Sequence, residues 1–490
     1  MSGIGESQCG DRILAEAERA AQAEALSTAQ IMGLGAMALA VLVIANDFTA
    51  LSVALPAIEQ GFDADVTTVQ WIITGYALVF GVLIVTGGRL ADMFGRRHIF
   101  FIGSTIFALF STLGGFATDA WMLLAARGAM GVGGALMWPA ILGMTYALTP
   151  AGRAALAGAL VLGSAGFGNA VGPLLGGGLT DALSWRWIFF LNLPIAVLAI
   201  AVVWRVVPRV AVDAKDQRID YAGVLTLSVG LLALLLALDL GVDLGWTSPS
   251  ILGLFVLSAA SLLLFARIER RAGEHALVPA DVLGNPTFLA ASMATLLMSA
   301  IFFAALLYLP QLMTKQFGFS AVGAGAGLLP MMGTFALTSF ASGPLYARLG
   351  AKLIVTIGAV CLAVGMFLLS RVEPTTTYLE LVPGMVVLGI GVGLFYSSIT
   401  TVAITALDPS QASLAGAIIY MFQIAGGAVG LGLNTALVVT APSLVDGIRI
   451  AFLVDAGLAA AGVLVAIFFV GGRVDRATLD TLLHRHRAHG

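Results

Sequence analysis

Long apolar runs follow one another along the whole chain, and the short stretches between them hold most of the charged residues. A helix that crosses the hydrocarbon core of a bilayer needs roughly 20 mostly apolar residues. The runs that meet this criterion are 31–55, 69–88, 98–117, 121–143, 154–178, 187–207, 221–241, 249–267, 288–310, 322–343, 352–371, 380–400, 412–437 and 448–471. The pattern therefore predicts an all-α membrane protein with 14 transmembrane helices.

The basic residues indicate how these helices are oriented. With an even number of spans both termini lie on one side of the membrane, and that side holds 19 of the 24 Lys and Arg residues. The other side holds four, and Arg127 lies within a span. Because cytoplasmic loops carry the excess of Lys and Arg, both termini are predicted to be cytoplasmic.

The composition agrees with a lipid environment and argues against several classes of function. Apolar residues make up 59% of the chain and charged residues only 10%, whereas a soluble domain has roughly 25% charged residues. The net charge of −3 provides no basic excess for binding nucleic acid. The longest segments between spans, 208–220 and 268–287, contain no phosphate-binding loop. Cys9 and Cys361 lack the spacing of a metal site, so we expect no metal. The spans contain no cluster of His, Glu or Ser residues, so we expect no enzyme activity and no cofactor.

Parts of the first half recur in the second half. Gly88, Leu90, Gly95 and Arg97 of one loop have counterparts 255 positions later, where the sequence from Gly343 ends in Lys352. A Leu-Pro pair closes both the first and the ninth span, and the fifth and thirteenth spans are both rich in glycine. Such repeats are common in transporters, which place their binding site between the two halves.

The repeat predicts the division of the chain. It gives a cytoplasmic N-terminal tail (1–30), an N-terminal six-helix bundle (31–207), a linker with two inserted transmembrane helices (208–287), a C-terminal six-helix bundle (288–471) and a cytoplasmic C-terminal tail (472–490).

Several short motifs identify a family. The loop after the second span reads GRLADMFGRR over 88–97, and the fifth span contains GNAVGPLLGG over 168–177. The first span contains DFT followed by VALP within 47–56, the fourth contains RGAMGVG over 127–133, and WRWIFFLNLP occupies 185–194. Together these motifs resemble those of the major facilitator superfamily, in particular its fourteen-span drug:proton antiporters.

Asp47 and Arg127 are the candidates for proton coupling. Each is a charged residue within an apolar span, which is costly and marks a functional site by default. By the rise of an α-helix, Asp47 lies roughly 12 Å and Arg127 roughly 9 Å from the outer ends of their spans. We therefore expect the two side chains to pair, and Asp47 to load and release a proton. A purely structural ion pair is the alternative.

The resemblance implies two further sets of site residues. In the family the 88–97 loop latches the outward-open state, which assigns that role here to Gly88, Asp92, Gly95, Arg96 and Arg97. The second copy of the loop has Ala347 in place of Asp92, so a weaker latch is expected there. The antiporter motif assigns a tight helix contact and a bend to Gly168, Gly172, Pro173, Gly176 and Gly177.

Other candidates are aromatic or acidic. The aromatic residues that can line an apolar substrate cavity are Phe48, Trp138, Phe302, Phe303, Tyr308, Phe395 and Tyr420. Asp455 lies inside the last span, and its part in coupling stays open. The departures from the family pattern, Ser52 and Met130, indicate a less polar cavity than usual.

These features predict a secondary transporter in a bacterial cytoplasmic membrane. It would export lipophilic, cationic, drug-like compounds in exchange for protons by alternating access, as a monomer within the lipid bilayer. A dedicated exporter of one metabolite or self-made antibiotic has the same motifs and remains an alternative. A transport-inactive sensor or scaffold is the alternative from another class, and the intact Asp47, Asp92 and Arg127 argue against it.

Overall fold

The computed structural model describes residues 26–64, 66–150, 153–208, 220–273 and 276–469, and its regular elements in these ranges are all helices. The N-terminal bundle consists of α2 (Thr28–Phe62), α3 (Val66–Phe94), α4 (Arg96–Gly115), α5 (Ala120–Leu148), α6 (Ala154–Ala182) and α7 (Arg186–Val206). Next come α8 (Tyr221–Leu244), α9 (Pro249–Ala272) and the short α10 (Ala280–Gly284). The C-terminal bundle consists of α11 (Pro286–Lys315), α12 (Ala321–Gly327), α13 (Leu329–Leu349), α14 (Ala351–Leu369), α15 (Tyr378–Thr405), the 3-10 turn η3 (Pro409–Gln411), α16 (Ala412–Thr440) and α17 (Leu444–Phe469).

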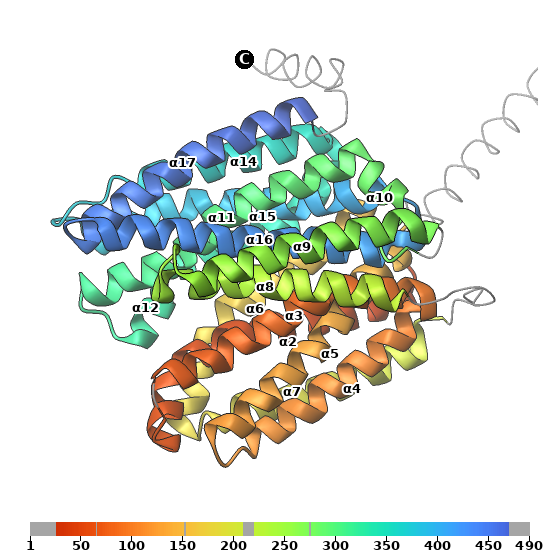
Figure 1. Ribbon diagram of the computed structural model, residues 1–490, viewed down its shortest axis with the longest axis horizontal. Coiled ribbons are helices and arrows are strands. Elements are labelled where there is room, and N and C mark those ends of the chain that lie inside the picture. Colours follow the sequence, from red (N-terminus) through yellow and green to blue (C-terminus); the bar gives the residue numbers. More distant parts are fainter. Residues whose placement is uncertain (1–25, 65, 151–152, 209–219, 274–275, 470–490) are drawn as a thin grey trace, which may run out of the picture.

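The two bundles lie side by side with their helices running in similar directions (Figure 1). They meet where α6 packs against α13 and α15, and where α16 packs against α3 and α5. The hairpin of α8 and α9 lies across the junction, and α8 contacts both α3 and α16. Through α8, the inserted pair of helices therefore touches both halves of the molecule.

Most of the predicted spans correspond to single long helices. Thirteen helical segments in the described ranges are long and apolar enough to cross a membrane. The tenth predicted span, 322–343, is divided in the structure, because α12 ends at Gly327 and α13 begins at Leu329. The prediction of one continuous helix there was wrong. Gly323, Gly325 and Gly327 favour helix poorly, and Pro330 has no N–H to continue the hydrogen-bond ladder. The count of 14 spans and the cytoplasmic position of the termini stay predictions.

The first span is longer than its apolar run. Helix α2 begins at Thr28, inside the predicted tail of 1–30, because Ser27 and Gln30 form a capping box. The Gln30 side chain also donates a hydrogen bond to the Leu148 carbonyl oxygen at 2.9 Å and so ties α2 to α5. The rest of that tail, 1–25, and the predicted C-terminal tail, 472–490, lie outside the described residues.

The repeated loops have the same backbone form. Gly95 and Gly350, which separate α3 from α4 and α13 from α14, have positive φ values of 96° and 82°. Residues that carry a Cβ atom rarely adopt positive φ values, which explains why both copies of the loop have glycine at this position. Gly88 lies against Ala417 at the start of α16, and Gly343 lies against Ala159 at the start of α6. The two halves therefore form equivalent close contacts with each other.

Candidate transport pathway

Asp47 and Arg127 lie together inside the N-terminal bundle, on α2 and α5. Both side chains are fully buried, and Asp47 Oδ2 forms an ion pair with Arg127 Nη1. Arg127 Nε also donates a hydrogen bond to the Ile72 carbonyl oxygen at 3.0 Å. The guanidinium carbon lies 4.3 Å from the centroid of the Tyr76 ring, within the range of a cation–π contact. The structure thus brings together the two charges that the sequence analysis expected to pair.

A second group of polar side chains supports this pair. The Asn192 side-chain amide on α7 donates hydrogen bonds to Asp47 Oδ1 at 3.3 Å and to Ser111 Oγ at 3.0 Å. Ser111 Oγ in turn donates to the Phe189 carbonyl oxygen at 2.8 Å. Sequence reasoning missed both residues. The signal was available for Asn192, because an amide within an apolar span needs a partner.

Close helix contacts hold Asp47 in place. A side chain at Gly168 would meet the Leu42 carbonyl oxygen at 2.8 Å, and side chains at Gly172 and Gly176 would collide with Thr49 and Ala50. These three glycines follow one another at intervals of one helical turn. They therefore let α6 lie directly on α2. Gly177 differs from them, because its nearest neighbours are Val322 and Val53 at 3.3 and 3.5 Å.

Asp92 connects the two bundles at the end of the helices that contains Gly95, which we call the latch end. Its carboxylate accepts hydrogen bonds from the backbone N–H groups of Ser413 and Leu414, at 3.3 and 2.8 Å. It also pairs with Arg96 Nε at 3.0 Å. The first turn of a helix has unpaired N–H groups with partial positive charge, so the start of α16 binds this carboxylate well.

Arg96 extends the same connection. It donates hydrogen bonds to the carbonyl oxygens of Gly143 in α5, at 3.1 Å, and of Pro409 and Ser410 in η3, at 2.5 and 3.2 Å. Asp408 caps η3, and hydrogen bonds from the Ser410 hydroxyl and then from its N–H lower the pKa of this exposed carboxyl. The carbonyl oxygens that Arg96 binds are thereby held in position. We call Asp92, Arg96, Ser413 and Leu414 the latch.

Arg97 does not join the latch, although the family motif assigned it that role. It donates a hydrogen bond to the Trp204 carbonyl oxygen at 2.6 Å, and its guanidinium carbon lies 5.4 Å from the Phe101 ring centroid. Both partners belong to the N-terminal bundle. The reason is helical geometry, because consecutive residues on α4 point about 100° apart and cannot both face α16.

A cavity of about 520 Å³ lies between the bundles, nearer the end opposite to the latch, which we call the cavity end. Its walls come from α2, α3, α6, α11, α12, α13 and α16. The lining is uncharged and mostly apolar, with polar groups from Thr49, Asn169, Gln311 and Thr314. Pro173 of the antiporter motif also lines it, within a helix that continues on both sides of the proline.

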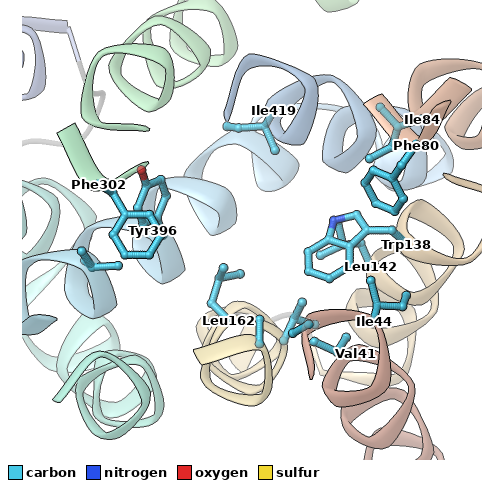
Figure 2. Packing of buried hydrophobic residues seen from close by; sticks show 14 of the residues in the cluster. Val41, Ile44, Phe80, Ile84, Trp138, Leu142, Leu162, Phe302, Tyr396 and Ile419 are labelled. Carbon is cyan, nitrogen blue, oxygen red and sulfur yellow. The ribbon is translucent and has the colours of Figure 1, made fainter. Parts of the chain in front are cut away.

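Among the aromatic candidates whose side chains the structure describes, Phe303 of α11 lines this cavity and the others do not. Trp138 lies 4.5 Å from Tyr420, and Phe80 lies 5.6 Å from Tyr420, measured between ring centroids. These rings come from α5, α16 and α3, and they close the junction of the bundles between the cavity and the latch. Figure 2 shows Trp138 and Phe80 in this cluster.

The other aromatic candidates pack within the C-terminal bundle. Phe302 lies beside Tyr396 (Figure 2), with 6.1 Å between their ring centroids, and the Phe395 and Tyr396 ring centroids are 5.5 Å apart. Tyr308 donates a hydrogen bond to Thr435 Oγ1 at 2.6 Å. The Phe48 side chain lies outside the described residues. Aromatic identity alone did not distinguish cavity residues from core residues.

Comparisons with known proteins agree with these features. A family model described as the Major Facilitator Superfamily matches residues 37–431 and 291–485. The puromycin resistance protein pur8 of Streptomyces alboniger is 34% identical over 409 residues, which is 82% of this chain and 80% of that protein. The methylenomycin A resistance protein of Bacillus subtilis is 30% identical over 456 residues, which is 91% of this chain and 96% of that protein.

A solved structure supports the fold. The human organic anion transporter MFSD10 is similar with a TM-score of 0.66 and 13% identity, covering 89% of this chain and 99% of that chain. The helices long enough to span a membrane, the packing of two bundles and the family match lead to one conclusion. The chain belongs to the major facilitator superfamily as a multi-pass membrane transporter rather than an enzyme, and it is similar to bacterial drug-resistance proteins.

Proposed function

We propose that the protein exports lipophilic, drug-like compounds in exchange for protons by alternating access. The observation that carries the proposal is the buried Asp47–Arg127 pair, in which Asp47 lies on the side of α2 that faces α5 and α7 while the other side of α2 lines the cavity. Thr49, which lines the cavity, follows Asp47 by two residues on α2. A proton that binds Asp47 would therefore change the contacts of a helix whose other side faces the site where a substrate fits.

The proposed cycle starts from the arrangement seen here. The latch joins the bundles at its end, and the aromatic cluster of Phe80, Trp138 and Tyr420 separates it from the cavity. If the latch end is cytoplasmic, as the basic residues predict, this is an outward-facing state. A proton from outside would neutralise Asp47 and leave Arg127 with the Ile72 carbonyl and the Tyr76 ring.

Loss of the ion pair would weaken the contact of α2 with α5. Removing one partner of a buried ion pair costs about 3–5 kcal/mol, because the other charge is left uncompensated. That free energy is comparable with what the hydrogen bonds of the latch supply, at about 1.5–3 kcal/mol for each bond to a charged group. Protonation would thus favour the opposite, inward-facing arrangement, from which the proton leaves to the cytoplasm.

The cavity lining narrows the substrates that we propose. Among the described lining residues no acidic side chain faces the cavity, and Asp47 is covered by Arg127 and Asn192. The expectation of cationic compounds therefore gains no support from the lining. Neutral or weakly charged lipophilic compounds with hydrogen-bonding groups fit the threonine, asparagine and glutamine side chains better.

Transport in proteoliposomes tests the proposal. Purified protein would be reconstituted with a panel of neutral and cationic lipophilic dyes, and dye uptake would be measured with and without an imposed pH gradient. We expect gradient-driven uptake by the wild type and loss of the gradient dependence in Asp47→Asn. Glu59→Gln, a change at the cavity end of α2 outside the ion pair, is the control and should behave as wild type. Uptake that ignores the gradient in the wild type would refute proton exchange.

The same panel separates the alternatives. A dedicated exporter would transport only one chemical class of the panel. It could also transport no compound of the panel and only a single metabolite outside it. A sensor or scaffold would move no compound, yet would still bind one with the same affinity in the wild type and in Asp47→Asn.

A further inference from the structure

A second carboxyl group is fully buried, in the C-terminal bundle. Asp455 on α17 has no exposed surface, and its Oδ1 accepts a hydrogen bond from the Asn434 side-chain amide on α16 at 3.1 Å. Its Oδ2 is also buried and has no hydrogen-bond partner among the described residues. No Lys, Arg or His of the described residues forms an ion pair with it.

This environment differs from that of Asp47. Asp47 has a guanidinium partner that neutralises its charge, whereas Asp455 has only one neutral amide. An ionised carboxylate without a cation in a protein interior costs far more free energy than the neutral acid. An Asp455 that carries its proton on Oδ2 avoids that cost, so we infer that the carboxyl group is protonated in this arrangement.

Asn434 belongs to a row of small residues along α16. A side chain at Gly426 would collide with Leu296 of α11, and one at Gly430 would collide with Ala300. Asn434 follows at the same spacing of four residues and also donates to the Gly430 carbonyl oxygen at 2.8 Å. The row therefore faces α11, and Asp455 lies where α11, α16 and α17 meet.

This junction lies directly behind the cavity wall. Leu431 on α16 lines the cavity and precedes Asn434 by three residues, which is less than one helical turn. On α11, Leu307 lines the cavity and its neighbour Tyr308 bonds to Thr435 of α16. Movement of α11 relative to α16 would open a short polar path from the cavity to Asp455.

We propose that Asp455 is a second proton-binding site, separate from the Asp47–Arg127 pair, which is loaded in this arrangement and empties as α11 and α16 move. The inference rests on the proposed proton exchange. The proton comes from water at the cavity, binds Oδ2 and returns to water on the other side, so only an O–H bond forms and breaks. Transport would then be coupled to one proton more than Asp47 alone carries, as long as the Asp47–Arg127 pair still switches the bundles between their two arrangements.

The surroundings leave Asp455 as the group that titrates. Tyr308 of α11 is titratable, and its hydroxyl donates a hydrogen bond to Thr435 rather than to Asp455. The other titratable side chains of α11, α14, α16 and α17 form no hydrogen bond or ion pair with Asp455 in the described part of the chain. They are Lys315, Lys352, Cys361, Tyr420, Asp446 and Arg449.

Infrared difference spectroscopy tests the site itself. Spectra of reconstituted wild type would be recorded between acid and alkaline pH and compared with those of Asp455→Asn, which keeps the shape of the side chain. We expect a carbonyl band of a protonated carboxylic acid that is absent from Asp455→Asn and disappears as pH rises. A band that persists at every pH, or no band at any pH, would show that Asp455 does not exchange protons and would overturn the proposal.

The limiting substrate gradient tests the link to transport. With the membrane potential clamped, each coupled proton contributes about a tenfold substrate ratio per unit of pH difference, or about 1.4 kcal/mol. We expect Asp455→Asn to lower the limiting substrate ratio about tenfold for each unit of pH difference. Transport by this variant should still respond to the pH gradient. An unchanged ratio in Asp455→Asn would refute the second site.

Two further measurements keep the proposal open to refutation. Loss of gradient dependence in the wild type would refute the proposed function itself rather than the role of Asp455.

If Asp455→Asn fails to fold, wild-type protein would be treated with dicyclohexylcarbodiimide, which modifies protonated carboxyl groups in apolar surroundings. Mass spectrometry should find Asp455 labelled at acid pH and less so at alkaline pH; labelling that is absent or independent of pH would count against the proposal.

Discussion

The ion pair of Asp47 and Arg127 affects both the stability of the N-terminal bundle and the proposed coupling to protons. Arg127 keeps its charge at any physiological pH, so its position in the bundle depends on compensation by Asp47, Ile72 and Tyr76. Asn192 supplies the remaining hydrogen bond to the carboxylate. A pair of this kind adds little net stability compared with apolar residues of similar size, but removing one partner is costly.

A double-mutant comparison separates stability from coupling at this pair. We expect Asp47→Leu to lower the free energy of unfolding by about 3–5 kcal/mol, because it leaves the Arg127 charge buried without its partner. The double variant Asp47→Leu/Arg127→Met should recover most of that loss, yet show no proton-driven transport. Thermal unfolding in detergent measures the first effect and proteoliposome uptake the second. A double variant that still exchanges protons would contradict the coupling role.

At the scale of helices, glycines decide which elements can approach. The contact of α2 with α6 depends on Gly168, Gly172 and Gly176, and the equivalent contact of α11 with α16 depends on Gly426 and Gly430. In lipid there is no hydrophobic force between helices, so such close van der Waals packing holds them together. The same contacts hold α2, which carries Asp47, against the cavity-lining helix α6, and place Asn434 beside Asp455.

Neighbouring glycines of α6 provide a matched test of this packing. Gly176→Ala should destabilise the protein by about 1–3 kcal/mol, because the added methyl group would collide with the Ala50 carbonyl. Gly178 is exposed and has no atom within 4 Å of an added Cβ, so Gly178→Ala should be neutral or stabilise the helix by about 1 kcal/mol. Thermal unfolding compares the two variants, and equal losses would contradict the packing argument.

The latch gives a prediction about the equilibrium between conformations. Asp92→Asn replaces hydrogen bonds to a charged group with weaker neutral ones, at a cost of about 1–2 kcal/mol to the closed latch end. The population should move roughly tenfold towards the inward-facing arrangement. Distances between spin labels on the two bundles would measure this shift. Arg97→Gln is the control, since Trp204 and Phe101, the partners described for Arg97, belong to the N-terminal bundle. An equal shift in both variants would argue against the latch.

At the scale of the whole molecule, transport requires the two bundles to move against each other. Tyr146 of α5 and Thr401 of α15 form a hydrogen bond of 3.0 Å between the bundles. Ser299 of α11 and Tyr396 of α15 form one of 2.8 Å within the C-terminal bundle. The protein thus offers one pair of sites that spans the moving junction and one that does not.

Cross-linking these two pairs tests the motion of the bundles as rigid units. Joining Tyr146→Cys to Thr401→Cys with a short thiol reagent should abolish transport, and a reductant should restore it. The same treatment of Ser299→Cys and Tyr396→Cys should leave at least half of the transport rate, because that pair moves together. Full transport by the first cross-linked pair would contradict alternating access.

The sequence by itself determined the membrane environment, the helical architecture and the family. These follow from local properties: the length of the apolar runs, the low content of charged residues, and motifs of a few adjacent residues. It also identified Asp47 and Arg127, because a charge in an apolar span is conspicuous whatever its partner.

Only the tertiary structure decided which residues meet. Asn192 joins Asp47 from 145 positions away, and Asp92 reaches the start of α16 across the junction of the bundles. The tertiary structure also places Phe303 at the cavity, whereas Phe302 packs against Tyr396. The reason is that the direction of a side chain depends on how its helix is rotated against its neighbours. That rotation is set by contacts between segments far apart in the chain, which no local pattern records.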